Sequence, residues 1–195
     1  MSKPLAALVA AICLGWTSGA AAHEIRTDKA PAGSPYAPYE FLVGDWGLTT
    51  KGSSEPIVTL RFKWGPNKSY LTYSAILLVK SVEQPHFEGM LVWNGVHKNL
   101  DMLLTIDMRR GLAQEQGTVS IGPDGVVVRD ITAVYSAGAQ QPGEPVVGPD
   151  GATQRYRQTF RKVDANHVET NALREGAHGW AATFPGSEAL LMTRK

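Results

Sequence analysis

Residues 41–46 read Phe41-Leu42-Val43-Gly44-Asp45-Trp46, and this stretch decides the fold. Three apolar side chains end at Gly44, and glycine lets the backbone turn sharply or approach a neighbour closely. Trp46 lies two positions later, so at strand period it points to the same side of the chain as Gly44. The pattern predicts a short helical turn that plugs one end of a barrel, followed by a first strand that carries Trp46 inward.

Short strand-like runs follow this stretch to the end of the chain. Leu100 to Met108 gives the cleanest alternation of apolar and polar residues, and Ile57 to Trp64 alternates well. Tyr70 to Lys80 is apolar on both faces, which predicts either a bulge in this strand or a contact with something outside the barrel. Further strands are expected at His86–Trp93, Leu112–Ile121, Val126–Tyr135, Gln154–Val163, Val168–Leu173, Trp180–Phe184 and Ala189–Arg194, the last two closing the barrel with the first strand. Roughly nine or ten antiparallel strands with tight turns predict an all-β barrel or sandwich.

Gly44-x-Trp46 at the head of an all-β chain resembles the Gly-x-Trp signature of lipocalins and the wider calycin group. The chain also resembles the small secreted bacterial lipocalin-like proteins of unknown function, from about Tyr39 to Arg194. This resemblance favours the barrel over the sandwich. It implies that Arg194, on the final strand, packs across Trp46 by a cation–π contact and closes one end of the barrel together with Gly44.

The first 22 residues have the pattern of a secretion signal. Lys3 supplies the positive start, Leu5 to Leu14 the apolar core, and Ala20-Ala21-Ala22 a small-residue cleavage site. The apolar run is too short to span a bilayer, and no second span follows. We therefore expect cleavage near Ala22 and a secreted, periplasmic protein. The expected divisions are a signal peptide at 1–22, a flexible N-terminal arm at 23–38 and a lipocalin-like β-barrel domain at 39–195.

Composition excludes several classes of function. The single cysteine, Cys13, lies inside the signal segment, so the expected mature chain has no thiolate chemistry, zinc–thiolate site or iron–sulfur cluster. The 19 basic and 18 acidic side chains nearly balance, which gives no electrostatic reason to expect a nucleic acid or an anionic membrane as partner.

A barrel of about eight to ten strands has an interior that side chains fill or that holds one small ligand. Five Trp and five Met suit an adaptable apolar pocket, although the same residues equally suit a solid core. We expect a small, mostly apolar molecule there, no cofactor, and a gate formed by the Gly- and Pro-rich segment Ser136–Thr153. The residues predicted to line the barrel are Trp46, Leu60, Phe62, Trp64, Tyr73, Trp93, Met102, Leu104, Tyr156 and Phe160.

Histidines supply an alternative, a metal-dependent or acid–base enzyme at the barrel rim. A hairpin around Asn94-Gly95 carries polar residues whose side chains would converge near one rim, namely His86, Glu88, His97 and Asp101. His23 becomes the first residue if cleavage follows Ala22. Its amino group and imidazole would then chelate copper with a second histidine.

Haem is disfavoured by a comparison with nitrobindins, calycin-like barrels that hold haem through a histidine near the C-terminal strand. Here Ala189–Arg194 contains no histidine, and His178 lies in a Gly-rich loop. The chain also has neither a Gly-x-Ser-x-Gly elbow nor a phosphate-binding glycine loop, so no catalytic constellation is visible.

Arg155, Arg157 and Arg161 share one strand face, opposite Tyr156 and Phe160. They form an outer basic stripe, which either meets an anionic partner or is a solvated face that prevents strand association. A protein-interaction module that uses this stripe or Tyr70–Lys80 is therefore the third class of function, after the favoured small-molecule binder and the rim enzyme.

Overall fold

The structure is a computed structural model and describes residues 29–50, 52–79, 82–107, 111–139 and 149–195. The signal segment 1–22, His23, Met108 and residues 140–148 of the predicted gate lie outside these ranges. The described strands are β1 Gly44–Thr50, β2 Val58–Trp64, β3 Leu71–Val79, β4 Val82–Asn94, β5 Asn99–Asp107, β6 Leu112–Ile121, β7 Val127–Tyr135, β8 Thr153–Lys162, β9 His167–Thr170, β10 Leu173–Gly176, β11 Gly179–Ala182 and β12 Leu190–Arg194. Two short 3₁₀ helices complete them, η1 Ala37–Leu42 and η2 Pro66–Lys68.

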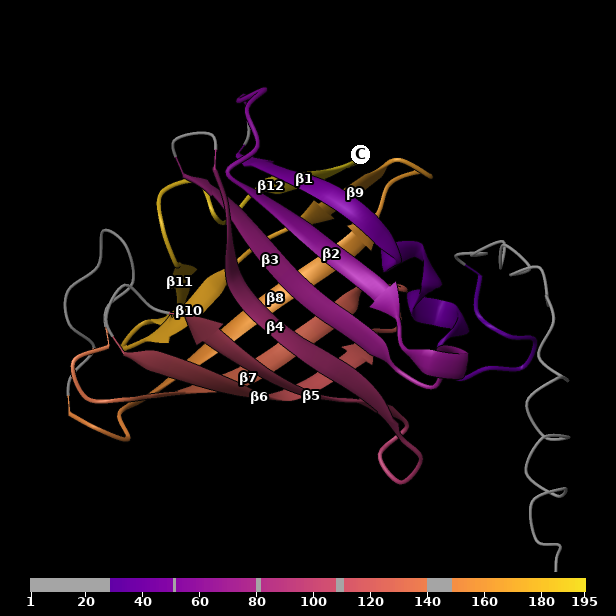
Figure 1. Cartoon of the computed structure of the whole chain (residues 1–195), viewed down its shortest axis with the longest axis horizontal. Helices are drawn as coiled ribbons and strands as arrows, with labels where there is room; N and C mark the ends of the chain where they lie inside the picture. The colour runs from indigo at the N-terminus through magenta and orange to yellow at the C-terminus, as the bar shows by residue number, and fades with distance from the viewer. Residues whose placement is uncertain (1–28, 51, 80–81, 108–110, 140–148) are drawn as a thin grey trace, which may run out of the picture.

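Ten of the described strands close into an antiparallel barrel. Each strand from β1 to β8 pairs with the next along the chain, β1 pairs with β12, β12 with β9, and β9 with β8. Figure 1 shows this barrel from the side, with β1 to β4 in front of β7 and β8. The prediction of an all-β antiparallel barrel is confirmed.

The C-terminal third departs from the predicted strand order. The segment expected at Trp180–Phe184 does not join the barrel wall, because the turn after Gly176 folds β11 back onto β10, outside the ring. The single strand expected at Val168–Leu173 is two strands. Asn171 separates them, and its Oδ1 accepts a hydrogen bond from the Thr159 backbone N–H at 3.0 Å, where a ladder bond would otherwise form.

β8 is therefore shared between two partners. Phe160 to Lys162 pair with β9, which closes the ring through three register pairs. Arg157 and Tyr156 pair with β10 instead. The opposite side of β8 pairs with β7 through eight register pairs, so the closing seam is much the shorter ladder.

The alternation predicted for β5 is present. Its inward residues Leu100, Met102, Leu104 and Ile106 are buried, and the residues between them are exposed. A bulge is present in this hairpin, but on β4, which pairs with the Tyr70–Lys80 run, rather than on that run itself. The register of β3 and β4 shifts between Ala75 and Ile76, and the extra residue is His86 on β4.

η1 lies across one end of the barrel, at the right in Figure 1. The Tyr39 hydroxyl donates to the Val119 carbonyl at 3.1 Å, and the Trp46 indole N–H donates to the Leu42 carbonyl at 2.7 Å. The described part of the predicted flexible arm differs from expectation. Tyr36 is buried there and bonds to β4, because its hydroxyl accepts from the Trp93 backbone N–H at 2.7 Å.

Candidate binding site in the barrel

A cavity of about 430 Å³ lies inside the barrel at the end opposite η1. Its walls come from the ends of the strands that lead away from η1, including Leu48 of β1, Leu77 of β3 and Ile106 of β5. The size and the mostly apolar wall are typical of small-molecule sites. The apolar lining residues are Leu48, Ile57, Val58, Leu60, Ala75, Leu77, Phe87, Ile106, Ala172, Leu173 and Phe184.

The floor of this cavity is polar and charged. Arg129 of β7 forms a buried ion pair with Glu115 of β6 and donates to the Gln158 Oε1 at 3.0 Å and to the Met102 Sδ at 3.1 Å. The Tyr73 hydroxyl donates to the same Gln158 oxygen at 3.4 Å. Arg129 is 8%, Glu115 7% and Gln158 7% exposed. Such a pair is costly to desolvate, so it indicates specificity more than stability.

The surroundings shift the ionisation of two floor residues. Burial raises the pKa of Tyr73 to about 12, so its hydroxyl stays protonated and remains a donor. Burial also raises the pKa of the Glu115 carboxyl, while the charge and hydrogen bond of Arg129 act in the opposite direction. The Arg129 guanidinium lies 5.5 Å from the centroid of the Tyr73 ring.

The bulge on β4 brings a histidine to the same cavity. Phe87 faces inward, and the extra residue His86 lines the cavity beside it. Burial lowers the pKa of His86, and the Asp107 backbone carbonyl and side chain partly oppose this. Bulges commonly re-aim a side chain next to a functional site.

A short loop holds Phe184 beside the cavity. The Ser187 side chain is fully buried, accepts from the backbone N–H groups of Thr183 and Phe184 at 2.8 and 3.2 Å, and donates to the Ala172 carbonyl at 2.7 Å. These bonds join the loop to the bend between β9 and β10. Phe184 lines the cavity and is 38% exposed, so this residue contacts both the cavity and solvent.

The ten residues predicted to line the barrel fall into three groups. Leu60, Tyr73 and Tyr156 line the cavity. Trp64 and Trp93 are half-buried near the η1 end, where the Trp64 ring meets Tyr36 edge-on at 5.9 Å. The others are buried in the core outside the cavity lining, namely Trp46, Phe62, Met102, Leu104 and Phe160. The barrel is thus filled toward η1 and hollow at the opposite end.

Gly44, Trp46 and Arg194 lie together at the filled end. The Arg194 guanidinium lies 4.2 Å from the centroid of the Trp46 ring and donates to the Val43 carbonyl at 2.9 Å. Gly44 has a φ of +137°, and a Cβ at this position would collide with the Arg194 guanidinium. Both the backbone conformation and the space therefore require glycine here.

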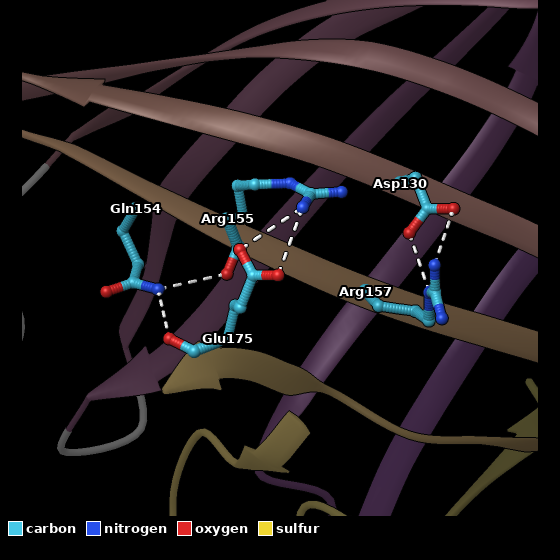
Figure 2. Close-up of polar contacts among 5 residues, drawn as sticks. All are labelled: Asp130, Gln154, Arg155, Arg157 and Glu175. Atoms are coloured by element: carbon cyan, nitrogen blue, oxygen red, sulfur yellow. Dashed lines mark hydrogen bonds and ion pairs between the residues drawn. The ribbon is translucent and has the colours of Figure 1, made fainter. Parts of the chain in front are cut away.

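The arginine stripe of β8 faces outward, as expected, but each arginine has an acidic partner. Figure 2 shows Arg155 beside Glu175, with Nη1–Oε1 at 3.0 Å, and Arg157 beside Asp130, with Nε–Oδ1 at 2.7 Å. Arg161 contacts Asp124 at 3.2 Å. Trp180 of β11 also lies over Arg157, at 4.6 Å from ring centroid to guanidinium. The stripe is largely neutralised, which weakens the case for an anionic partner.

The four residues expected at one rim do not converge. His86 lies at the cavity end of β4, whereas His97 lies in the β4–β5 turn at the opposite end of the hairpin. Glu88 is exposed on the outer face, and the Asp101 carboxylate accepts from Asn94 at 2.8 Å. Among the described residues, no group of three or more His, Cys, Asp or Glu side chains is arranged to hold a metal ion.

The buried floor was missed by sequence reasoning, although a signal was present. Glu115 is in phase with Ala113 and Val119 on β6, and Arg129 is in phase with Val127 and Ile131 on β7. Charged residues at inward positions of adjacent strands, one of each sign, indicate an internal ion pair. Gln158 has the same phase as Phe160.

A larger hollow of about 630 Å³ lies elsewhere, along β1, β12 and β9. It involves residues at outward positions of these strands, such as Thr49, Glu169 and Leu191. Arg161, which also borders it, is already paired with Asp124. The barrel cavity, with its buried polar floor, is therefore the stronger candidate.

In the described ranges no helix is long and apolar enough to cross a membrane. No protein-family model matches this sequence, and a search of curated proteins finds no significant match. The site must therefore be interpreted from its own geometry.

Proposed function

We propose that this protein binds a small, mostly apolar molecule in the barrel cavity, as an exported lipocalin-like carrier. The cavity with its buried polar floor is the observation that supports the proposal. The Gly44-x-Trp46 signature at the head of a ten-stranded barrel agrees with the lipocalin-like assignment. Its export is proposed from the signal pattern of residues 1–22.

Native mass spectrometry of the protein purified from its own exported fraction tests both statements. The denatured mass gives the cleavage point, and a mass equal to the full chain would contradict export through this signal. A heavier native mass that is lost on denaturation would support the carrier and begin to identify the ligand. A gain of one copper ion would instead support the enzyme based on His23.

A matched pair of variants locates the bound molecule. Leu77 faces the cavity and Ile76 faces outward from the same strand. Leu77→Trp fills the cavity and should abolish uptake of a neutral fluorescent probe such as N-phenyl-1-naphthylamine, whereas Ile76→Trp should retain it. Equal uptake by both variants would place binding outside the barrel and overturn the proposal.

A further inference from the structure

Two arginines border the described part of the cavity, Arg129 from inside the barrel and Arg157 from β8 with its side chain on the outer face, and both are neutralised. Arg129 pairs with Glu115 inside the barrel. Arg157 is held by Asp130 through two bonds, Nε–Oδ1 at 2.7 Å and Nη2–Oδ2 at 3.1 Å. No lysine contributes to this lining. The cavity therefore offers no unpaired permanent cation among its described residues to hold an anionic ligand.

The charge balance of the floor depends on the ionisation of Glu115. Arginine cannot lose its proton in a protein, so Arg129 brings a positive charge into the barrel. Protonating Glu115 would leave that guanidinium buried without a counter-ion, which is strongly unfavourable. Burial raises the pKa of the Glu115 carboxyl, and the direct contact between the Arg129 Nη2 and the Glu115 Oε2 opposes this by favouring the ionised form.

The floor nevertheless keeps hydrogen-bonding capacity. A guanidinium has five N–H donors, and the described contacts of Arg129 use its Nε, one N–H of Nη1 and one of Nη2. The remaining N–H groups can donate to an uncharged oxygen. A ligand carboxylate in the same place would put a second negative charge beside Glu115, and like charges that share a site repel.

We propose that the cavity selects a neutral ligand, with an apolar body and one uncharged oxygen that accepts a hydrogen bond from Arg129, over the anion of the same shape. An alcohol, ketone, ester or amide meets this requirement, and a fatty-acid anion does not. The inference rests on the proposed function. His86 fits it, because burial lowers the pKa of its imidazole and so disfavours a cation near the ligand.

Isothermal titration calorimetry with 1-decanol and decanoate tests the selection, because these probes share their apolar body. At neutral pH we expect decanol to bind more tightly by about tenfold or more. Decanoate binding as tightly as decanol, or more tightly, would overturn the inference and leave the carrier proposal standing. Binding of both probes to detergent micelles is the positive control for the calorimetry. If this control succeeds but neither probe binds the protein, both the selection and the carrier proposal fail for single-chain ligands.

Charge variants give a second, independent test. Glu115→Gln retains an acceptor beside Arg129 but leaves the floor positive, so the preference should shift toward decanoate. The double variant E115Q/R129Q restores neutrality and should again favour decanol. Glu175→Gln removes a carboxylate from the outer face and is the matched control, with the order of the two probes unchanged. If E115Q does not fold, the relative affinities of the wild type and the double variant for decanol and decanoate still test the inference. A double variant that binds decanoate more tightly than decanol contradicts it.

Discussion

Arg129 and Glu115 form their ion pair although they are four residues out of register. The Cα partner of Arg129 across β6 and β7 is Val119, and the partner of Glu115 is Ala133. Gly117 lies between Val119 and Glu115 on the same inward face. A Cβ at Gly117 would collide with the backbone of Asp130 and Ile131, so glycine at this position lets β6 and β7 approach closely between the two ends of the ion pair.

Removing one partner of this pair should destabilise the protein strongly. Glu115→Leu or Arg129→Met leaves one buried charge unpaired, and we expect a loss of about 3–5 kcal/mol in the free energy of unfolding. The apolar double variant E115L/R129M should recover most of the loss, because neither charge is then buried. Urea denaturation of the four proteins gives the coupling energy. Two single losses that simply add in the double variant would show that the pair is not coupled.

The contact between Arg194 and Trp46 should stabilise the filled end. Trp46→Ala removes a fully buried indole and should cost about 3–5 kcal/mol. Arg194→Ala should also lower the melting temperature markedly, because its guanidinium donates to the Phe41, Val43 and Ala165 carbonyls. Lys195→Ala, which removes one exposed hydrogen bond to Thr59, is the control. An Arg194→Ala protein as stable as this control would contradict closure by the arginine.

Substitution of Gly44 tests whether the filled end requires glycine. Gly44 and Gly138 both have positive φ, at +137° and +71°, but of the two only Gly44 has a side chain in the space of its missing Cβ. Gly138→Ala reports the strain of the left-handed region without a collision, which costs on the order of 1–3 kcal/mol. Gly44→Ala should lose clearly more stability in thermal denaturation, since a φ of +137° is more strongly restricted to glycine and Arg194 must also move. Equal losses would show that neither the backbone conformation nor the contact with Arg194 requires glycine here.

The pH dependence of stability should depend partly on His86. Its folded-state pKa is below the ordinary value of 6.5, so the unfolded chain binds the proton more tightly. Stability from this residue is therefore present above pH 6.5 and is lost as pH falls toward the folded-state pKa. Melting temperatures measured at a series of pH values should fall less on acidification for His86→Gln than for the wild type. His97→Gln, in an exposed turn, should follow the wild-type curve, and an H86Q curve parallel to it would refute the assignment.

Ser187 should control how firmly Phe184 is held at the cavity. Ser187→Ala leaves two backbone N–H groups and the Ala172 carbonyl without their side-chain partner. We expect a stability loss of about 1–3 kcal/mol and faster ligand release, measured by stopped-flow displacement of the bound probe. Ser53→Ala, on an exposed turn, is the control. A release rate unchanged from the wild type would mean that Phe184 does not retain the ligand.

The sequence predicted the strands because the dominant signals of a strand are local, whereas the choice of a barrel over a sandwich came from the resemblance to lipocalins. Alternation in β5 and β2 and the turn residues between strands report burial on one face, and one buried face is enough to fix a strand. The pairing of one strand with another is different, because it depends on which strand edges in the sheet have no partner yet. The sequence of β11 resembles that of a strand in the barrel wall, and it was expected to close the barrel with β1. It pairs with β10 instead, because a tight turn joins these two strands.

The hollow part of the interior could not be found from inward phase alone. Phe62 and Tyr73 have equally inward positions on neighbouring strands, and their rings stack at 4.4 Å, yet only Tyr73 lines the cavity. Whether an inward side chain lines the cavity depends on its position along the barrel axis. That position is set by the tilt and register of the strands, which the inward phase of a residue does not report. The bulge that turns His86 toward the cavity is a tertiary feature of the same kind.

The short ladder between β8 and β9 gives the ring a weak point. Three register pairs join β8 to β9, and beyond them the side chain of Asn171 replaces the next backbone bond before β10 begins to pair with β8. Local opening is easiest where few backbone hydrogen bonds must break, so we expect β9 amides to exchange with deuterium before those of β5 and β6. Gln158 and Ala172, on either side of this seam, both line the cavity. A transient separation of β8 and β9 would therefore open a lateral entrance through the barrel wall, by which a ligand could reach the polar floor without passing Phe184.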